Sequence, residues 1–330
     1  MALFALAAAS SAGAASLFED DSVLELELSG PIEQLIKHKE ERQKWPFQLR
    51  ESDKEQDVLV SARGKSRMRL CKFPMLRFNF ESQGSPGSIF EGLDKIKLVT
   101  HCRNRDNSEQ DVLEEYAAYR IFSLITPVSY RVRLVHMYYN DTAGRLDEDA
   151  ARRFGFLIEP TKHLAARVGG VDTEIPAVSL AALDSGQAAL VYVFQYLIGN
   201  TDWSLVTAEE DDACCHNGRL IKIGPKLFLV PYDFDLAGIV NAKYARPDPS
   251  LRISKVRTRL YRGFCMDTDV LRGAIRRVNS LEAEIRAVIT DLPLLSEKEK
   301  KKQTTYVGKF FDRSRDEEKI LERFEKTCHP

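Results

Sequence analysis

Residues 227–238 read LFLVPYDFDLAG, an apolar run that ends in two aspartates. The run has the composition of a buried strand, and Pro231 ends it. Asp233 and Asp235 follow with a single phenylalanine between them, although carboxylates are rarely buried without a partner. Because side chains alternate along a strand, the two carboxylates are expected to point to the same side. The stretch therefore predicts a polar site at the end of a strand.

The rest of the chain divides into a strand-rich part and a helical part. An antiparallel meander is expected from about 57 to 101, and two long helices are expected to close the chain over 266–291 and 295–327. Since strands and helices do not alternate, a doubly wound sheet is excluded. Further elements are expected as strands over 22–30, 129–140 and 152–159 and as helices over 108–125, capped by Ser108, and 179–200.

The overall composition is that of an ordinary globular protein. Lysine and arginine number 48 and aspartate and glutamate 49, so the charge predicts no nucleic-acid partner. No window is apolar and long enough for a membrane span, so no integral membrane domain is expected. Residues 1–16 are alanine-rich with a short apolar run, which predicts a signal peptide or a disordered alanine-rich segment. Export to a periplasmic or extracellular location follows from the first alternative.

Six cysteines are present, and none has the C-x-x-C spacing of a zinc site. An exported chain would carry one or two disulfides, with Cys71 and Cys102 the first expected pair. In the alternative, all six are reduced and act as small buried hydrophobic residues.

Several polar residues lie at the ends of elements between 196 and 238. Asp202 follows the helix that ends near Asn200, and Asn217 precedes the strand that leads to Asp233. Each alone is as well explained as a turn residue. Together they form the inventory of phosphoryl transfer, in which one aspartate orients the attacking hydroxyl while asparagine and another aspartate hold Mg²⁺.

Nucleotide phosphates would need a cation from the strand-rich part. Lys95 and Lys97 share one face of a predicted strand. The helix over 108–125 is expected to offer a glutamate partner. Helical spacing places Glu114 at the flank of its buried face and Glu115 nearer the opposite side.

In this order, the motifs resemble the CotH kinase family of spore-coat-type atypical protein kinases, and more broadly HipA-like atypical kinases. The resemblance covers about residues 70–265. It implies an α+β, bilobed, protein-kinase-like fold with an antiparallel β-rich N-lobe and a mostly helical C-lobe. The expected boundaries are an N-terminal extension over 17–56, the N-lobe over 57–160 and the C-lobe over 161–330, with a catalytic segment at 196–238. The matching residues are KIKL (95–98), EEYAAYRIF (114–122), RRFGFLIE (152–159), YLIGNTDW (196–203), HN (216–217) and VPYDFD (230–235).

By this resemblance, Asp202 is the catalytic aspartate, and Asn217 and Asp233 are metal ligands with Asp235 as a secondary one. Lys97 contacts the ATP phosphates. The chain departs from the family pattern by a longer acidic segment between 202 and 217. The remaining nucleotide-site candidates are Lys95, Glu115 (which the family pattern favours over Glu114) and Glu159 near the hinge.

The resemblance implies an ATP-dependent phosphotransferase that uses Mg²⁺ or Mn²⁺ and acts on a protein or another hydroxyl-bearing acceptor. Two alternatives stay open: a non-catalytic pseudokinase-like binding or cell-surface scaffold protein, and an AMP transferase using the same cleft. The basic stretch 250–265 is expected either to bind an acidic substrate or to pair with the acidic segment 207–212.

Overall fold

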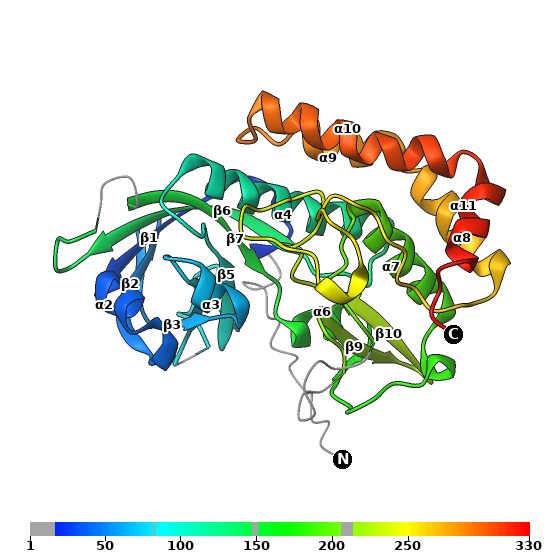
Figure 1. Ribbon diagram of the computed structural model, residues 1–330. Helices are drawn as coiled ribbons and strands as arrows, with labels where there is room; N and C mark the ends of the chain where they lie inside the picture. Colours follow the sequence, from blue (N-terminus) through cyan, green and yellow to red (C-terminus); the bar gives the residue numbers. More distant parts are fainter. Residues whose placement is uncertain (1–16, 82, 147–150, 206–213) are drawn as a thin grey trace, which may run out of the picture. The chain divides into compact units, whose positions relative to one another are not determined.

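The computed structural model describes residues 17–81, 83–146, 151–205 and 214–330, and the chain folds into two compact units (Figure 1). The first unit comprises residues up to 104 together with 133–158, and the second comprises 105–132 together with 159–330. The expected signal peptide, residues 1–16, lies outside the described residues.

The first unit is built around a closed barrel of seven strands in the order β1-β2-β3-β4-β5-β7-β6. Strand β1 pairs antiparallel with β2 on one side and parallel with β6 on the other, which closes the barrel. Apolar residues at alternate positions fill its core, as the period-two pattern requires. The strands are β1 (Leu24–Gly30), β2 (Trp45–Glu51), β3 (Lys54–Arg63), β4 (Met75–Asn79), β5 (Lys95–Val99), β6 (Val132–Asp141) and β7 (Arg152–Ile158).

Short helices decorate this unit: α2 (Ile32–Lys37), the 3₁₀ turn η1 (Lys39–Glu41) and α3 (Ser66–Leu70). The expected strands at 22–30, 129–140 and 152–159 and the meander β3-β4-β5 are confirmed. The predicted Cys71–Cys102 disulfide is also confirmed, with an Sγ–Sγ distance of 2.12 Å.

The second unit contains a small antiparallel sheet in the order β10-β9-β8 and most of the helices. Helix α7 is apolar on nearly all sides because it is buried within this unit. Phe194 of α7 packs against Phe122 of α4, with ring centroids 4.6 Å apart. The elements are α4 (Asp106–Ile125), α6 (Thr161–Arg167), β8 (Val171–Thr173), η2 (Leu180–Ala182), α7 (Ser185–Ile198), β9 (Gly218–Ile223), β10 (Lys226–Pro231), η3 (Pro249–Leu251), α8 (Thr268–Asn279), α9 (Glu282–Thr290), α10 (Glu297–Ser314) and α11 (Glu317–Glu325).

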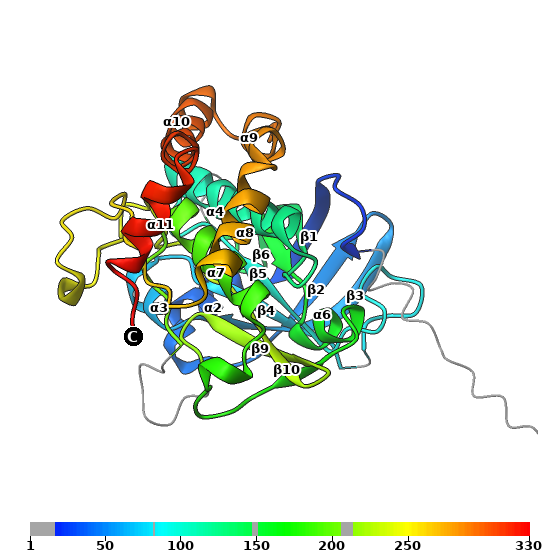
Figure 2. The same ribbon diagram turned by 90° about the vertical axis from the view of Figure 1, so that its right-hand side faces the viewer.

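Several expected helix boundaries are wrong. The helix over 108–125 exists, but it begins at Asp106, so Ser108 lies inside it and does not cap it. The helix expected over 179–200 starts only at Ser185, where the side chain of Asp184 accepts a hydrogen bond from the Gln187 amide. Both long C-terminal helices are broken, into α8 and α9 and into α10 and α11, and α9 and α10 lie side by side (Figures 1 and 2).

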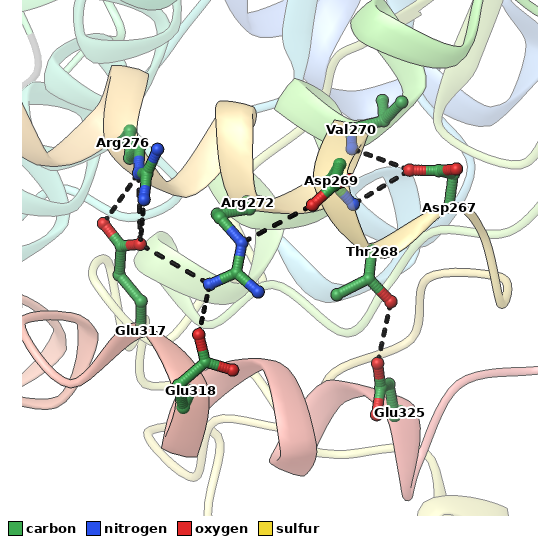
Figure 3. Close-up of polar contacts among 9 residues, drawn as sticks. All are labelled: Asp267, Thr268, Asp269, Val270, Arg272, Arg276, Glu317, Glu318 and Glu325. Carbon is green, nitrogen blue, oxygen red and sulfur yellow. Dashed lines mark hydrogen bonds and ion pairs between the residues drawn. The ribbon is translucent and has the colours of Figure 1, made fainter.

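The last helix is tied back to α8 in two ways. Cys265 and Cys328 form a disulfide across a sequence separation of 63. Figure 3 shows Arg272 and Arg276 of α8 directed at the first turn of α11, where both contact Glu317. Since the Arg276 side chain is 64% exposed, solvent screens the charges of this network, and the disulfide is the stronger restraint.

The predicted fold class, a bilobed protein-kinase-like α+β fold, is wrong. The strands close into a seven-stranded barrel that includes a parallel pair, and a separate three-stranded sheet and nine α-helices complete the described part of the chain. This arrangement differs from the separate N- and C-lobes of a kinase. Strand β1 accounts for the error, because alternation in residues 22–30 predicts a strand but not that it pairs with β6.

Candidate functional site

The end of helix α7 presents Asp202. Gly199 adopts φ 65°, and the amide of Asn200 donates to the Gln195 carbonyl at 2.8 Å, so the helix closes with a left-handed turn. Asn200 is 1% exposed, and its Oδ1 accepts the Asp202 amide at 2.9 Å. Asn200 therefore shapes the turn, while the Asp202 side chain remains 36% exposed.

Two arginines of the basic stretch hold this loop in place. Arg262 donates to the carbonyls of Thr201 and, at 2.8 Å, Trp203. Arg259 donates to the last carbonyls of α7, including Leu197 at 2.9 Å, where the helix dipole favours a cation. Burial lowers the pKa of Arg262, and the negative charge of Asp202 acts against that shift. These two side chains thus support the loop from within the second unit. The acidic segment 207–212 lies outside the described residues, so that pairing stays a prediction.

A tight turn brings two further side chains to Asp202. Cys215 and Gly218 exchange backbone hydrogen bonds of 3.4 and 3.2 Å, which leaves His216 and Asn217 at the tip. His216 Nε2 lies 3.0 Å from Asp202 Oδ1. Asn217 Nδ2 donates to Asp202 Oδ2 and to the Asp202 carbonyl, both at 2.8 Å. The carboxylate is therefore oriented through both of its oxygens.

The end of β10 brings Asp233 next to this turn. Gly218 pairs with Pro231, and the Tyr232 amide donates to the Asn217 carbonyl at 3.1 Å. Asp233 follows with φ 64°, and its amide donates to Tyr119 Oη at 2.9 Å. Within the described residues, the partly buried Asp233 carboxylate has no hydrogen-bond or ion-pair partner.

Asp235 lies in a different environment. The strand ends at Pro231 and Asp233 is left-handed, so the expected strand alternation that would pair the two carboxylates is wrong. Phe234 packs between Tyr119 and Phe194, with ring centroids 4.6 and 5.3 Å away. Asp235 is 4% exposed and accepts a hydrogen bond from Tyr244 Oη at 2.9 Å, so it has a structural partner.

The three glutamate candidates are all buried in the second unit. Glu114 faces α10, where Gln303 Nε2 donates to its carboxyl. Burial raises the pKa of Glu114 well above its usual value, because desolvation disfavours the charged form. Glu159 accepts a two-pronged contact from Arg167 at 2.9 and 2.8 Å, so its carboxylate is already compensated. Glu115 is 2% exposed on α4.

The two lysine candidates belong to the first unit. Lys95 and Lys97 lie on β5, opposite Asn79 and Arg77 of β4. The alternation that places them on one face is confirmed by this register. The structure therefore brings together Asp202, Asn217 and Asp233 in the second unit, and these three form the candidate site.

Three contributors to the site were not predicted. His216 lies beside Asn217 in the sequence, but the phosphoryl-transfer pattern assigns it no role, and Tyr119 carries no sequence signal that links it to Asp233. The third is a disulfide between the neighbours Cys214 and Cys215, which starts the turn. Adjacent cysteines were the available signal.

The donor set suits a hard cation. Because both contacts of Asn217 to Asp202 use Nδ2, its Oδ1 remains without a partner in the described part of the chain. The Asp233 carboxylate is also unpartnered there, and the backbone of the adjoining Tyr232 is hydrogen-bonded to the Asn217 carbonyl. Mg²⁺ takes one or two such oxygens and completes its shell with phosphate and water. No group of three or more histidine, cysteine, aspartate or glutamate side chains occurs at metal-binding spacing in residues 17–81, 83–146, 151–205 and 214–330.

Comparison with known proteins leaves the site to be interpreted from its own geometry. No family model matches the chain, and no curated protein matches it. Among the described residues, no helix combines the length and apolar character needed to cross a membrane.

Proposed function

We propose that the second unit carries a phosphotransfer site that uses ATP with Mg²⁺ or Mn²⁺ and a hydroxyl-bearing acceptor, such as a protein serine or threonine. The observation that supports it most directly is the pairing of an oriented carboxylate, Asp202, with two free oxygen donors, Asn217 Oδ1 and the Asp233 carboxylate. These are the base and the metal ligands that phosphoryl transfer requires.

Asp202 is the proposed base. His216 and Asn217 hold its two oxygens, so the carboxylate is oriented before an acceptor binds. Its 36% exposed side chain remains accessible to a hydroxyl group. Proton acceptance by such a group is one contribution to transfer, and fixing the acceptor oxygen in line with the phosphate is the other.

Asn217 and Asp233 would hold the cation. A cation held there would supply positive charge that stabilises the phosphoryl group being transferred. The backbone amide of Asp233 donates a hydrogen bond to the Tyr119 hydroxyl. The side-chain Nδ2 of Asn217 donates to the Asp202 carboxylate. The Asn217 side chain and the Asp233 backbone are therefore held by the protein before the metal arrives.

The proposal rests on the site and not on the fold. The same chemistry occurs on unrelated folds, so the closed barrel of the first unit does not bear on the residues of the second. Membership in the CotH kinase family and export from the cytoplasm remain parts of the proposal, and each is supported by the sequence pattern alone.

The test combines nucleotide binding with phosphotransfer. Asp233→Asn should weaken metal-dependent ATP binding at least tenfold, whereas Asp202→Asn should abolish transfer and keep binding. Asp291→Asn, at an exposed aspartate after α9, is the matched control and should behave as wild type in both assays. Thermal melting checks that each variant is folded.

Other results would contradict the proposal. Absence of both ATP binding and transfer in the wild type, or an Asp233→Asn variant equal to wild type, would refute it. ATP binding without any transfer would favour the non-catalytic binding protein. Mass spectrometry of the acceptor distinguishes an added phosphate from an added AMP.

A further inference from the structure

The turn that orients Asp202 begins at an unusual crosslink between neighbours. Cys214 and Cys215 form a disulfide, and Cys215 is the first residue of the hydrogen-bonded turn that ends at Gly218. The two residues at the tip, His216 and Asn217, are the ones that contact the Asp202 carboxylate. The crosslink is therefore covalently continuous with the residues that orient the proposed base.

This disulfide contributes little to global stability. In the chain-entropy account, a crosslink between adjacent residues stabilises by only about 1 kcal/mol. The Cys265–Cys328 bond, with a separation of 63, stabilises by about 4 kcal/mol on the same account. The effect of the Cys214–Cys215 bond must accordingly be local.

Cys214 supplies a fixed point for the turn. Its amide donates to the Ile175 carbonyl at 2.8 Å, and its Sγ lies 3.1 Å from the Leu205 carbonyl. Cys214 and Cys215 are 3% and 5% exposed. The sulfur–sulfur bond thus restrains the Cys215 side chain against an anchored residue, and breaking it removes that restraint.

We propose that Cys214–Cys215 is a redox-modification site that controls the geometry of the Asp202 site. A dithiol reductant attacks one sulfur to give a mixed disulfide, and its second thiol then displaces the protein sulfur. The protein gains two electrons and two protons as two thiols, and the reductant leaves as a disulfide. The turn 215–218 then loosens, and His216 and Asn217 lose their hold on Asp202. Because both cysteines are buried, exchange occurs only when the turn opens locally.

Two backbone amides report on the turn without any assay of catalysis. The Ser204 amide donates to the His216 carbonyl at 3.2 Å, and the Tyr232 amide donates to the Asn217 carbonyl at 3.1 Å. Hydrogen exchange at these amides is measured before and after treatment with dithiothreitol, and alkylation with peptide mapping identifies which cysteines were reduced. Exchange should become at least fivefold faster when Cys214 and Cys215 are reduced, and a smaller change would overturn the proposal, as would a bond that remains intact.

The double variant Cys214→Ser, Cys215→Ser is the matched control. It should exchange quickly at both amides without reductant and should not respond to it, so any further change on treatment belongs to the other two disulfides. The effect on catalysis rests on the proposed function: phosphotransfer should fall at least fivefold on reduction and recover on reoxidation. Unchanged transfer despite faster exchange would refute control of Asp202. A wild type inactive with ATP refutes the proposed function instead, while the exchange data still decide the redox site.

Discussion

The buried carboxyl of Glu114 makes a specific prediction about stability and pH. Glu114 is 2% exposed, accepts a hydrogen bond from Gln303, and has Lys302 Nζ 4.0 Å from its Oε1. Desolvation raises the pKa of Glu114 well above its usual value, and the neighbouring Glu299 adds to the shift, whereas Lys302 and Gln303 oppose it. The folded protein therefore holds a proton here at a pH where an exposed glutamate has lost it.

The direction in which pH changes the free energy of unfolding follows from this difference in proton binding. In the unfolded chain Glu114 ionises with a pKa of about 4.3, so above that pH the unfolded state binds fewer protons than the folded state. The free energy of unfolding contributed by this group is fully present below the unfolded pKa. It is lost as the pH rises from there toward the raised folded pKa.

Glu114→Gln should remove this loss. The amide of glutamine keeps the shape and an acceptor oxygen for Gln303 without a titrating proton. We expect urea denaturation at pH 5, 6 and 7 to show the variant gaining stability relative to wild type as the pH rises. Glu284→Gln is the control, since Glu284 is exposed on α9 and has no polar partner within the described residues. A difference between wild type and Glu114→Gln that stays constant from pH 5 to pH 7 would refute the reasoning, because it would mean that Glu114 is ionised in both states.

Three other predictions concern the framework of the second unit. Gly199→Ala should destabilise by about 3 kcal/mol in thermal or urea unfolding, because Gly199 has φ 65° and a Cβ there would lie 1.9 Å from Tyr306 Oη. Tyr306→Phe in that background should recover all but about 1 kcal/mol, and no recovery would contradict the steric explanation. Arg259→Lys should lower the free energy of unfolding in urea by about 2–3 kcal/mol. Lysine replaces neither the guanidinium contacts to the end of α7 nor the stacking of the guanidinium carbon 3.8 Å from the centre of the Tyr306 ring. An unchanged urea midpoint would show that a positive charge alone is enough to stabilise the end of α7. Loss of Cys265–Cys328 by double serine substitution should cost about 4 kcal/mol, and a loss equal to that of Cys214–Cys215 would contradict the loop-entropy account.

Local pattern predicted the strands of the barrel but not how they are joined. The alternation in residues 22–30 and 129–140 correctly indicates β1 and β6, because one face of each is buried in the barrel core. Their parallel pairing is a contact between residues more than 100 positions apart, and each strand has the same alternation whichever partner it takes. A closed barrel therefore could not be distinguished from an open antiparallel sheet.

The broken C-terminal helices show that apolar periodicity does not predict where a helix ends. Apolar periodicity continues through Leu281 and through Arg315, where α8 gives way to α9 and α10 to α11. No proline or glycine marks either break. The breaks allow successive helices to fold back and pack against the same unit. As a result, Arg272 of α8 contacts Glu317 at the start of α11 (Figure 3).

The candidate site was easier to predict than the fold because its residues are close in sequence. Asp202, Asn217 and Asp233 fall within 32 positions, and each lies close to the end of a regular element. For Asp235, residue type and spacing did not predict the environment of the side chain. Its type and spacing match those of Asp233, but one left-handed residue after the strand sends it to Tyr244 in the interior.

Asp233 combines two costs that packing alone does not explain. A left-handed conformation is unfavourable for a residue other than glycine by about 1 kcal/mol, and Asn217, which lies next to it, bears the same cost with φ 51°. The Asp233 carboxylate is also partly buried with no partner in the described part of the chain, where a neutral residue would avoid desolvation. Backbone strain of this kind persists where the surroundings over-determine it, and here the Tyr119 hydroxyl and the β9–β10 pairing do so. A cation held by Asp233 and Asn217 would offset the desolvation of the Asp233 carboxylate, whereas Asp235 already has its tyrosine and Glu159 its arginine.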